Sequence, residues 1–463
     1  MAYSTPYFPS FRAQCAPLGR ATRRVRTATD SLSGLAGLFG GYFGALLVPA
    51  KKGPGSRQRD LPRVAVFWAF LGQVLTRGSG VRWAVARLQA DALTHKRKVP
   101  KESTSAYCQA RSALPLAWLK ALFEALGRSF EPHGVGAWLG RTVRLLDGTG
   151  FSMPDTKPNR QRWPYAAKQK PGCGFPTGKI NAWFCLHTGR MLGFVESSWK
   201  THDVVLALQL LRAVKAAEVW VADRAYCSWF FLALLRLKKA DFVVRLHHSR
   251  KVRKGPCGSW LETWAKPLKS KRRPSRFWKT LPEQMPVRFV RFRGRTRQGV
   301  FKKIIVVTSL LDEKMFPDSA IAELYAQRWQ IELHYRQIKT NLSLDILRCL
   351  TPKMIEKELW MHAIAYNLVH RLLLEASLRH HVPLARLSFK GALDAALAWA
   401  DRLPRSRPAR TRSLLALFAR IAADLVPFRP HRNEPRARKR RPKSYQLLTR
   451  PRHKMRVSPS RRC

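Results

Sequence analysis

Acidic side chains are scarce in this sequence. The chain of 463 residues holds 28 Asp and Glu against 86 Lys and Arg, which gives a formal net charge of +58. A chain this basic repels itself unless a polyanion neutralises it, so DNA or RNA is the expected partner. An anionic membrane surface is the second candidate. An arginine-rich genome would explain part of the excess but not its clustering.

Closely spaced cysteines are also missing. The eight Cys are scattered along the chain, and none forms a Cys-x-x-Cys pair. This spacing argues against a zinc site and against a disulfide framework. It fits a reducing compartment, so we expect a cytoplasmic protein that is associated with the nucleoid.

Long hydrophobic runs are nearly absent, and the one uncharged run is a poor membrane span. It extends over Leu32–Ala50, and five of its nineteen residues are Gly. A spanning helix needs about 20 mostly apolar residues, and a secretory signal would begin earlier in the chain. We expect instead a buried or amphipathic segment of an N-terminal domain, and no membrane partner.

Helical periodicity dominates the first part of the chain. Residues 1–60 are expected to form a basic, poorly defined arm. The pattern from Val64 to about Gly127 then predicts a compact helical domain over residues 61–140. Its basic edges suit DNA docking, although no single helix-turn-helix signature stands out.

Short apolar runs replace the helical pattern over residues 141–249. They predict elements in the order β, β, β, α, β, α, β. The first strand ends at Asp147, a hairpin covers 179–197, and a buried strand over 219–222 ends at Asp223. A first strand, a hairpin and then alternating units describe an α/β fold with an RNase H-like core.

A basic segment interrupts this core over residues 250–310. Arg250 to Lys303 holds eighteen Lys and Arg against two acids. The alternation over 286–293 and the apolar run over 300–309 predict strands. We therefore expect a β-rich insertion with a basic face.

The second part of the core is expected over residues 311–400. It should contain one long helix from about Ser319 to Leu342, followed by further helices. A C-terminal helix and a basic tail are expected over 401–463. The tail from 429 onward has fourteen Lys and Arg, five Pro and one acid, so we expect it to order only on a polyanion.

Two acids follow the predicted buried strands, Asp147 and Asp223. The carboxyl ends of parallel strands share one edge of a sheet, where ligands bind in α/β proteins. Phosphodiester cleavage can use two Mg²⁺ ions about 3.5–4 Å apart, and Mg²⁺ prefers carboxylate oxygens. The alternative is that each Asp only caps a turn or a helix, as Asp155 and Asp203 are expected to do. Asp155 is also the nearby alternative to Asp147 as the first acid.

A helical stripe supplies a third acid. Tyr325, Arg328, Glu332 and Lys339 fall within about 60° of one another at about 100° per residue. Stripes of alternating charge are often only solvated faces. Here one acid is flanked by a phenol and two cations, which suits a metal ligand beside side chains that bind phosphate.

Together these motifs resemble those of the bacterial insertion-sequence DDE transposases with the Tyr-Arg-Glu-Lys (YREK) signature. The spacing is Y-x2-R-x3-E-x6-K, in Tyr325-Ala-Gln-Arg328-Trp-Gln-Ile-Glu332 followed by Lys339. Asp147-Gly148-Thr149 is similar to the first Asp motif of the family, and Ala222-Asp223-Arg224-Ala225-Tyr226 to the second. Trp360–Asn367 resembles the helix that follows the signature. The resemblance covers roughly residues 60–450.

The resemblance implies both an activity and a site. It implies an RNase H-like fold with a β-rich insertion before the Glu, and a catalytic and metal-binding triad of Asp147, Asp223 and Glu332. The cofactor would be two Mg²⁺ ions, with Mn²⁺ as a substitute. The reaction would be cut-and-paste transposition of an insertion sequence, by strand cleavage and strand transfer at terminal inverted repeats.

The resemblance also implies partners. These are double-stranded DNA, as transposon ends and target, and a second copy of the chain in a paired-end complex. The DNA-contacting side chains would be Tyr325, Arg328, Trp329 and Lys339. One Trp of the insertion would stack on a flipped base. The candidates are Trp260, Trp264 and Trp278. Buried structural roles for these three residues stay equally open.

Two other functions stay open. The chain could be a catalytically silent or domesticated DNA-binding protein derived from such a transposase, although all three acids are intact. Paired carboxylates alone would also permit a glycosidase. The basic stripe and the basic insertion do not suit a neutral sugar.

Overall fold

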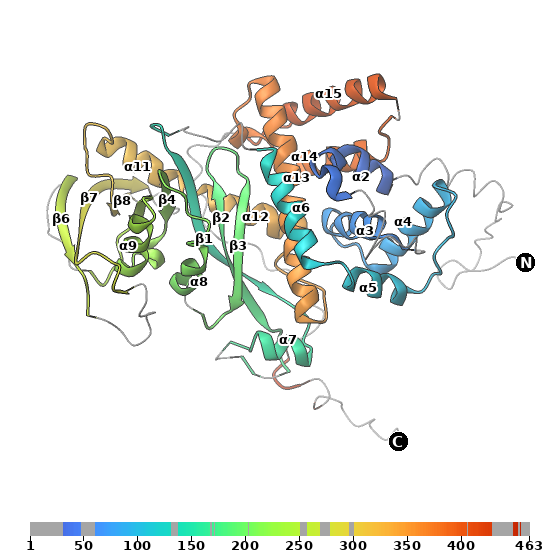
Figure 1. Ribbon diagram of the computed structural model, residues 1–463, viewed down its shortest axis with the longest axis horizontal. Coiled ribbons are helices and arrows are strands. Elements are labelled where there is room, and N and C mark those ends of the chain that lie inside the picture. The colour runs from blue at the N-terminus through green and yellow to red at the C-terminus, as the bar shows by residue number, and fades with distance from the viewer. Residues whose placement is uncertain are drawn as a thin grey trace, which may run out of the picture.

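A mixed α/β fold with one large sheet is present, beside a body of packed helices (Figure 1). The computed structural model describes residues 31–47, 61–130, 138–166, 169–170, 172–201, 203–250, 257–268, 278–295, 301–404, 406–427, 448–451 and 454. The α/β class predicted from the sequence is confirmed. Most of the expected N-terminal arm and most of the basic tail lie outside the described residues.

Eight strands form the sheet in the order β3-β2-β1-β4-β5-β8-β7-β6. β1 pairs parallel with β4, and β4 pairs parallel with β5; the other pairs are antiparallel. The strands are β1 (Thr142–Ser152), β2 (Thr177–Cys185), β3 (Met191–Ser198), β4 (Glu218–Ala222), β5 (Asp241–Arg245), β6 (Gly258–Ala265), β7 (Gln284–Arg295) and β8 (Phe301–Thr308).

The two faces of the sheet carry different hydrophobic cores, because side chains alternate along each strand. In β4, Val219 and Val221 join one core, whereas Trp220 and Ala222 join the other. Every residue of β4 is buried, as expected for a parallel strand that is covered on both faces. This explains why its sequence is a continuous apolar run.

Short helices cover both faces of the sheet. α8 (Asp203–Leu210) and α9 (Trp229–Leu237) pack on one face, next to the short turn η4 (Arg224–Tyr226). On the opposite face lie α11 (Asp318–Gln327), α12 (Gln330–Arg336) and the π-helical turn η5 (Gln337–Asn341). Helix α7 (Lys157–Arg162) follows β1.

The basic segment over 250–310 extends the central sheet and does not form a sheet of its own. β8 pairs antiparallel with β5, with Val244 opposite Val307, and β7 and β6 follow outward. The strands predicted over 286–293 and 300–309 are confirmed by β7 and β8. The segment therefore interrupts the core in the sequence, but its strands extend the core's sheet beyond β5 (Figure 1).

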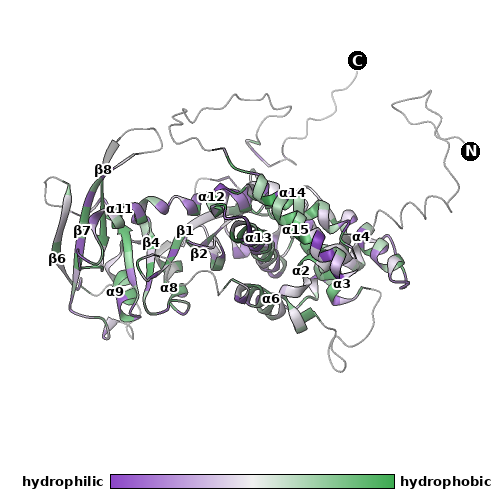
Figure 2. Ribbon diagram, turned by 90° about the horizontal axis from the view of Figure 1, so that it is seen from above, coloured by the Kyte–Doolittle hydropathy of each residue, from purple (hydrophilic) through white to green (hydrophobic). Residues whose placement is uncertain are grey.

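The helices from the two ends of the chain form one body. α13 (Pro352–His380) packs against α3 (Arg63–Leu75) and α6 (Leu116–Arg128) from the N-terminal part, and against α14 (Phe389–Ala400) and α15 (Arg407–Ala423) from the C-terminal part. Figure 2 shows α13 surrounded by these helices. The remaining helices of the body are α4 (Val81–Thr94), α5 (Thr104–Ser112) and the short turn η6 (Leu384–Arg386).

The uncharged run near the N-terminus contributes to this body. Its described part forms α2 (Ser31–Phe39) and the 3₁₀ turns η1 (Gly40–Tyr42) and η2 (Gly44–Leu47). A Cβ at Gly34 would lie 1.7 Å from the carbonyl oxygen of Ala400, so glycine permits the close approach of α2 to α14. The prediction of a buried N-terminal segment is confirmed. None of the described helices is long and apolar enough to span a membrane.

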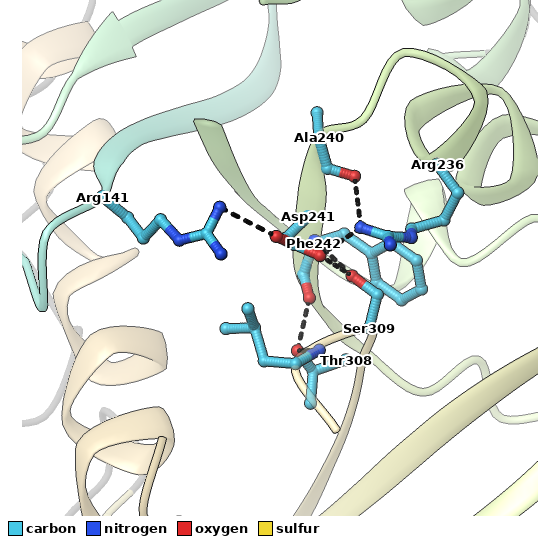
Figure 3. A network of polar contacts seen from close by, with 8 residues as sticks. Arg141, Arg236, Ala240, Asp241, Phe242, Thr308 and Ser309 are labelled. Atoms are coloured by element: carbon cyan, nitrogen blue, oxygen red, sulfur yellow. Dashed lines mark hydrogen bonds and ion pairs between the residues drawn. The ribbon is translucent and has the colours of Figure 1, made fainter. Parts of the chain in front are cut away.

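A polar network fastens the start of β5 to its surroundings (Figure 3). The Asp241 carboxylate, 6% exposed, accepts hydrogen bonds from Arg236 and from the Ser309 hydroxyl, the latter at 2.8 Å, and pairs with Arg141 at 3.4 Å. The Thr308 hydroxyl donates to the carbonyl oxygen of Phe242 at 2.6 Å. One carboxylate thus joins β5 to β8, to α9 and to the start of β1.

We predict that Asp241→Ala lowers the free energy of unfolding by about 2 kcal/mol, because it leaves the buried Ser309 hydroxyl without its acceptor and removes the partner of Arg236 and Arg141. Urea denaturation measures this change. Lys390→Ala is the control, since it removes one partner of the exposed Lys390–Asp394 pair and should change stability by less than about 0.5 kcal/mol. Equal effects of the two substitutions would contradict the role of the network.

Two buried histidines pack behind the β2–β3 hairpin. His334 of α12 stacks on Phe184 with ring centroids 5.1 Å apart, and His370 of α13 lies 5.5 Å from His334. Burial lowers the pKa of His334 to about 4 and that of His370 well below its usual value. Both imidazoles are therefore neutral at pH 7.

We predict that this pair makes stability depend on pH. Between pH about 6.5 and 4 the unfolded chain binds protons that the folded chain excludes, so the free energy of unfolding falls as pH falls through this window. His334→Phe keeps a ring against Phe184. The substitution should reduce the loss of the free energy of unfolding between pH 7 and pH 4.5 by roughly 1–3 kcal/mol. Urea denaturation at pH 4.5 and pH 7 measures the difference, and parallel curves for both proteins would refute it.

Candidate active site

Parallel pairing of β1 with β4 brings Asp147 and Asp223 together. The last paired residues are Leu146 and Ala222, and each acid is the next residue on its strand. Neighbouring strands lie about 4.8 Å apart. β4 ends here and Asp223 caps η4, whereas β1 continues beside β2. The two acids therefore stand side by side where the parallel pairing stops.

Hydrogen bonds hold Asp147 in place. Its Oδ1 accepts from the backbone N–H of Gly148 at 2.8 Å. Its carbonyl oxygen accepts from the hydroxyl of Tyr335 at 2.6 Å, and the same hydroxyl accepts from the backbone N–H of Ala182 at 3.2 Å. Tyr335 thus attaches α12 to β1 and β2 at the position of the first acid.

The long helix predicted from Ser319 to Leu342 is wrong in detail. α11 ends at Gln327, and α12 begins at Gln330. Between them the N–H groups of Arg328 and Trp329 bond to carbonyls three residues earlier, as in a 3₁₀ helix. After Arg336 the winding widens into the π-helical turn η5. The predicted stripe of side chains assumed uniform α-helical winding. The helix does not have uniform winding, because of the 3₁₀ and π-helical turns.

Arg328 lies between two of the predicted acids. Its Nη1 is 3.8 Å from Oδ2 of Asp147, and its Nη2 is 3.5 Å from Oε1 of Glu332. Its side chain is 17% exposed, so little solvent screens the attraction. One guanidinium therefore brings the carboxylate of β1 and the carboxylate of α12 to the same place.

Tyr325 connects this pair to the third acid. Burial raises the pKa of its phenol to about 12; the charge of Arg328 lowers it and the charge of Asp223 raises it. The phenol therefore remains protonated at neutral pH and can donate a hydrogen bond. Its ring packs edge-on against Phe292 of β7, so the strands that extend the sheet help to fix it.

Trp329 and Lys339 are the other two predicted DNA-contacting residues. Trp329 is half-buried and follows Arg328 directly. Lys339 belongs to the π-helical turn, and burial lowers the pKa of its ammonium while the charge of Asp345 raises it. Arg328 lies close to Glu332, as the predicted stripe requires, whereas Lys339 lies in the π-helical turn, beyond the uniform winding that the stripe assumed.

Asp155, the alternative first acid, is engaged elsewhere. Its carboxylate accepts hydrogen bonds from Arg160 at 2.9 Å and from the hydroxyl of Tyr165. It therefore anchors the segment around α7. Asp147 lies near Arg328, which also contacts Glu332, whereas Asp155 does not; the choice of Asp147 as the first acid stays a prediction. Sequence reasoning missed Tyr335. The available signal was spacing, since Tyr335 lies three residues after Glu332 on the same helix face.

The donor set fits a hard divalent cation. Asp147, Asp223 and Glu332 offer carboxylate oxygens, which Mg²⁺ and Mn²⁺ prefer. Within the described ranges, no group of three or more His, Cys, Asp or Glu side chains is close enough to hold a metal ion. Arg328 instead supplies positive charge between two of the three acids.

Comparisons with known proteins agree with this chemistry. The family described as "Transposase DDE domain" matches residues 138–368, and the family described as "Insertion element 4 transposase N-terminal" matches residues 49–124. The chain belongs to the IS4-type DDE transposases. Transposases of this kind bind DNA and use divalent metal ions. The transposase is also 27% identical over 402 residues to "Transposase InsG for insertion sequence element IS4" of Escherichia coli (strain K12), covering 84% of this chain and 88% of that relative.

Among solved structures, the transposase is similar to a chain in the cryo-EM structure of a piggyBac transposase synaptic complex with hairpin DNA. The TM-score is 0.42 at 11% identity, over 88% of this chain and 86% of that chain. The insertion-sequence transposase predicted from the sequence is thus confirmed, on the matches to the two families and to the relative.

The three tryptophans proposed to stack on a flipped base already contact protein groups. Trp260 stacks on Phe289 with centroids 5.0 Å apart, and Trp278 stacks on Phe230 at 6.0 Å. Trp264 is 8% exposed, with a guanidinium 3.8 Å from its ring. These contacts favour structural roles for all three.

We predict that Arg328→Lys slows single-turnover strand cleavage by about 10–100-fold, the usual cost of losing a group that orients metal ligands. Lysine keeps the charge but lacks the fork that spans two carboxylates. Arg336→Lys is the matched control, because Arg336 is an exposed arginine at the end of α12, the helix that follows Arg328. Cleavage at the wild-type rate by Arg328→Lys would show that the bridge has no catalytic role.

Proposed function

We propose that this transposase catalyses cut-and-paste transposition with Asp147, Asp223 and Glu332 as the residues that hold two Mg²⁺ ions. The observation that carries the proposal is that Arg328 lies between Asp147 of β1 and Glu332 of α12, while the pairing of β1 with β4 puts Asp223 next to Asp147. Mn²⁺ is expected to substitute for Mg²⁺, because it accepts the same ligands.

The topology supports an RNase H-like assignment for the core. Strands β3, β2 and β1 are antiparallel, and β1, β4 and β5 are parallel in the order β3-β2-β1-β4-β5. Helix α12 packs on β1 from one face. We assign residues 141–249 and 311–400 to this core, residues 61–140 to DNA docking and residues 250–310 to a basic insertion.

Bound cations would supply Lewis acidity for the attack of water on the phosphorus and for the departure of the 3′ oxygen. The chain's own residues have separate tasks. The neutral Tyr325 phenol donates a hydrogen bond to a phosphate oxygen. The Arg328 guanidinium offers a planar set of donors to the same phosphate group. We also assign a DNA backbone contact to Lys339 and a DNA contact near the cut to Trp329.

The partners follow from charge and from the reaction. A net charge of +58 favours tight binding of DNA, because Lys and Arg side chains neutralise its phosphates. Joining two transposon ends requires two active sites, so we propose a homodimer that acts on double-stranded DNA at the nucleoid. A silent DNA-binding derivative is the second candidate, and the intact set of acids speaks against it.

We predict that Asp147→Asn, Asp223→Asn and Glu332→Gln each reduce Mg²⁺-dependent nicking at the terminal inverted repeats by at least about 10³-fold. The reason is that several kcal/mol of transition-state stabilisation depend on the metal ions. Binding of the same DNA, measured by fluorescence anisotropy, should change little.

Asp155→Asn is the matched control, since Asp155 bonds only locally to Arg160 and Tyr165. It should nick at nearly the wild-type rate. Nicking by any of the three acid variants at the rate of this control would remove that acid from the metal site.

A further inference from the structure

Tyrosines follow two of the three acids at the same distance along the chain. Tyr226 comes three residues after Asp223, and Tyr335 comes three residues after Glu332. The two tyrosines are 0% and 6% exposed, and a buried hydroxyl is costly unless it is hydrogen-bonded. Both hydroxyls bond to the same strand, β2.

Tyr335 bonds to β2 and β1 from one face of the sheet. Its hydroxyl donates to the carbonyl oxygen of Asp147 at 2.6 Å and accepts from the backbone N–H of Ala182 at 3.2 Å. Asp147 lies opposite Ala182 in the pairing of β1 with β2. The ring packs edge-on against Phe184 of β2, with centroids 5.6 Å apart. The hydroxyl therefore fixes how close α12 lies to the sheet at the first acid.

Tyr226 bonds to β2 from the opposite face. Its hydroxyl accepts from the side-chain amide of Asn181, which is fully buried, at 3.0 Å. Asn181 precedes Ala182 on β2 and lies opposite Gly148. Tyr226 belongs to the hydrophobic core on one face of the sheet, and Tyr335 belongs to the core on the other face. Two phenols thus hold β2 at consecutive residues, one from each face.

The segment between each acid and its tyrosine is short and regular. The backbone N–H of Tyr226 donates to the carbonyl oxygen of Asp223 at 3.0 Å, which closes the turn η4. Glu332 and Tyr335 both belong to α12, and residues three apart are neighbours on one face of a helix. A displacement of either phenol would therefore displace the acid on the same turn.

We propose that Tyr226 and Tyr335 are positioning residues, which hold two of the acids at fixed places relative to Asp147. Tyr226 acts on Asp223, and Tyr335 acts on Glu332. This inference rests on the proposed function, in which the three acids hold divalent cations. Two ions about 3.5–4 Å apart require carboxylates from separate elements to keep their separation. Loss of a group that orients metal ligands costs about 10–100-fold in metal affinity.

Binding of Mn²⁺ tests the proposal without turnover. The full-length transposase is bound to terminal-repeat DNA that has already been cut, and the electron paramagnetic resonance signal of free Mn²⁺ measures how much of the ion is bound. Tyr226→Phe and Tyr335→Phe should each raise the Kd for Mn²⁺ by about 10–100-fold. On uncut DNA, the Mn²⁺ concentration for half-maximal nicking should rise by a similar factor. The nicking rate should recover as Mn²⁺ is raised, because the acids are intact.

Tyr366→Phe is the matched control. Tyr366 is fully buried, and its hydroxyl donates to the carbonyl oxygen of Gly189, at the turn between β2 and β3, at 2.8 Å. This variant also loses one buried hydrogen bond, so it should lower the urea midpoint about as much as the other two variants. It should leave the Kd for Mn²⁺ unchanged. The same Mn²⁺ affinity in all three tyrosine variants would show a merely structural role and overturn the proposal.

The acid variant Asp147→Asn separates this proposal from the proposed function. Lost Mn²⁺ binding in Asp147→Asn, with wild-type affinity in Tyr226→Phe and Tyr335→Phe, would overturn the positioning role alone. Wild-type affinity in Asp147→Asn would overturn the proposed metal site, and the positioning role with it. Weaker binding in all three of these variants, with Tyr366→Phe unaffected, is the result that both proposals predict.

Discussion

The Arg328 guanidinium lies between the carboxylates of Asp147 and Glu332, which would otherwise repel each other. These acids come from distant parts of the chain, one from a strand and one from a helix. In a chain with so few acids, two carboxylates at one place are costly unless positive charge lies with them. Arg328 supplies that charge and fixes the distance at which α12 can pack on β1.

The rest of the fold places this arginine. Tyr335 ties α12 to β1 and β2 through one hydroxyl, and the parallel pairing of β1 with β4 puts Asp223 next to Asp147. The charges of Arg328 and Asp223 both act on the pKa of the Tyr325 phenol, and the Tyr325 ring packs against Phe292 of β7. The strands that continue the sheet outward and the helices on its face thus meet at the same group of side chains.

Much of this site was predictable because its signals are local. The buried strand β4 ends next to Asp223 as predicted. The first strand does not end at Asp147, since β1 continues to Ser152 beside β2; only its pairing with β4 stops there. The spacing of Tyr325, Arg328 and Glu332 places them near one another on a helix of any ordinary winding. The strands of the basic segment were likewise visible in its alternation. A local sequence pattern specifies a helix or strand and its exposed face. The predictions of these strands and of this helix face therefore required no knowledge of contacts between distant residues.

The remaining features depend on contacts between distant residues. Nothing in the alternation of β7 and β8 says that they pair with β5, and nothing in α2 says that it packs on α14. The change from 3₁₀ to π winding around α12 has no signal in the sequence, because packing decides which hydrogen-bond register a helix adopts.

The most direct test of the central claim is to locate the cation in the protein. Fe²⁺ placed in the site of the DNA-bound transposase generates hydroxyl radicals that cut the polypeptide nearby. The account predicts cuts close to residues 147, 223 and 332, suppressed by excess Mg²⁺ and absent near residue 155. Cuts elsewhere, or cuts near only one of the three acids, would contradict a shared metal site.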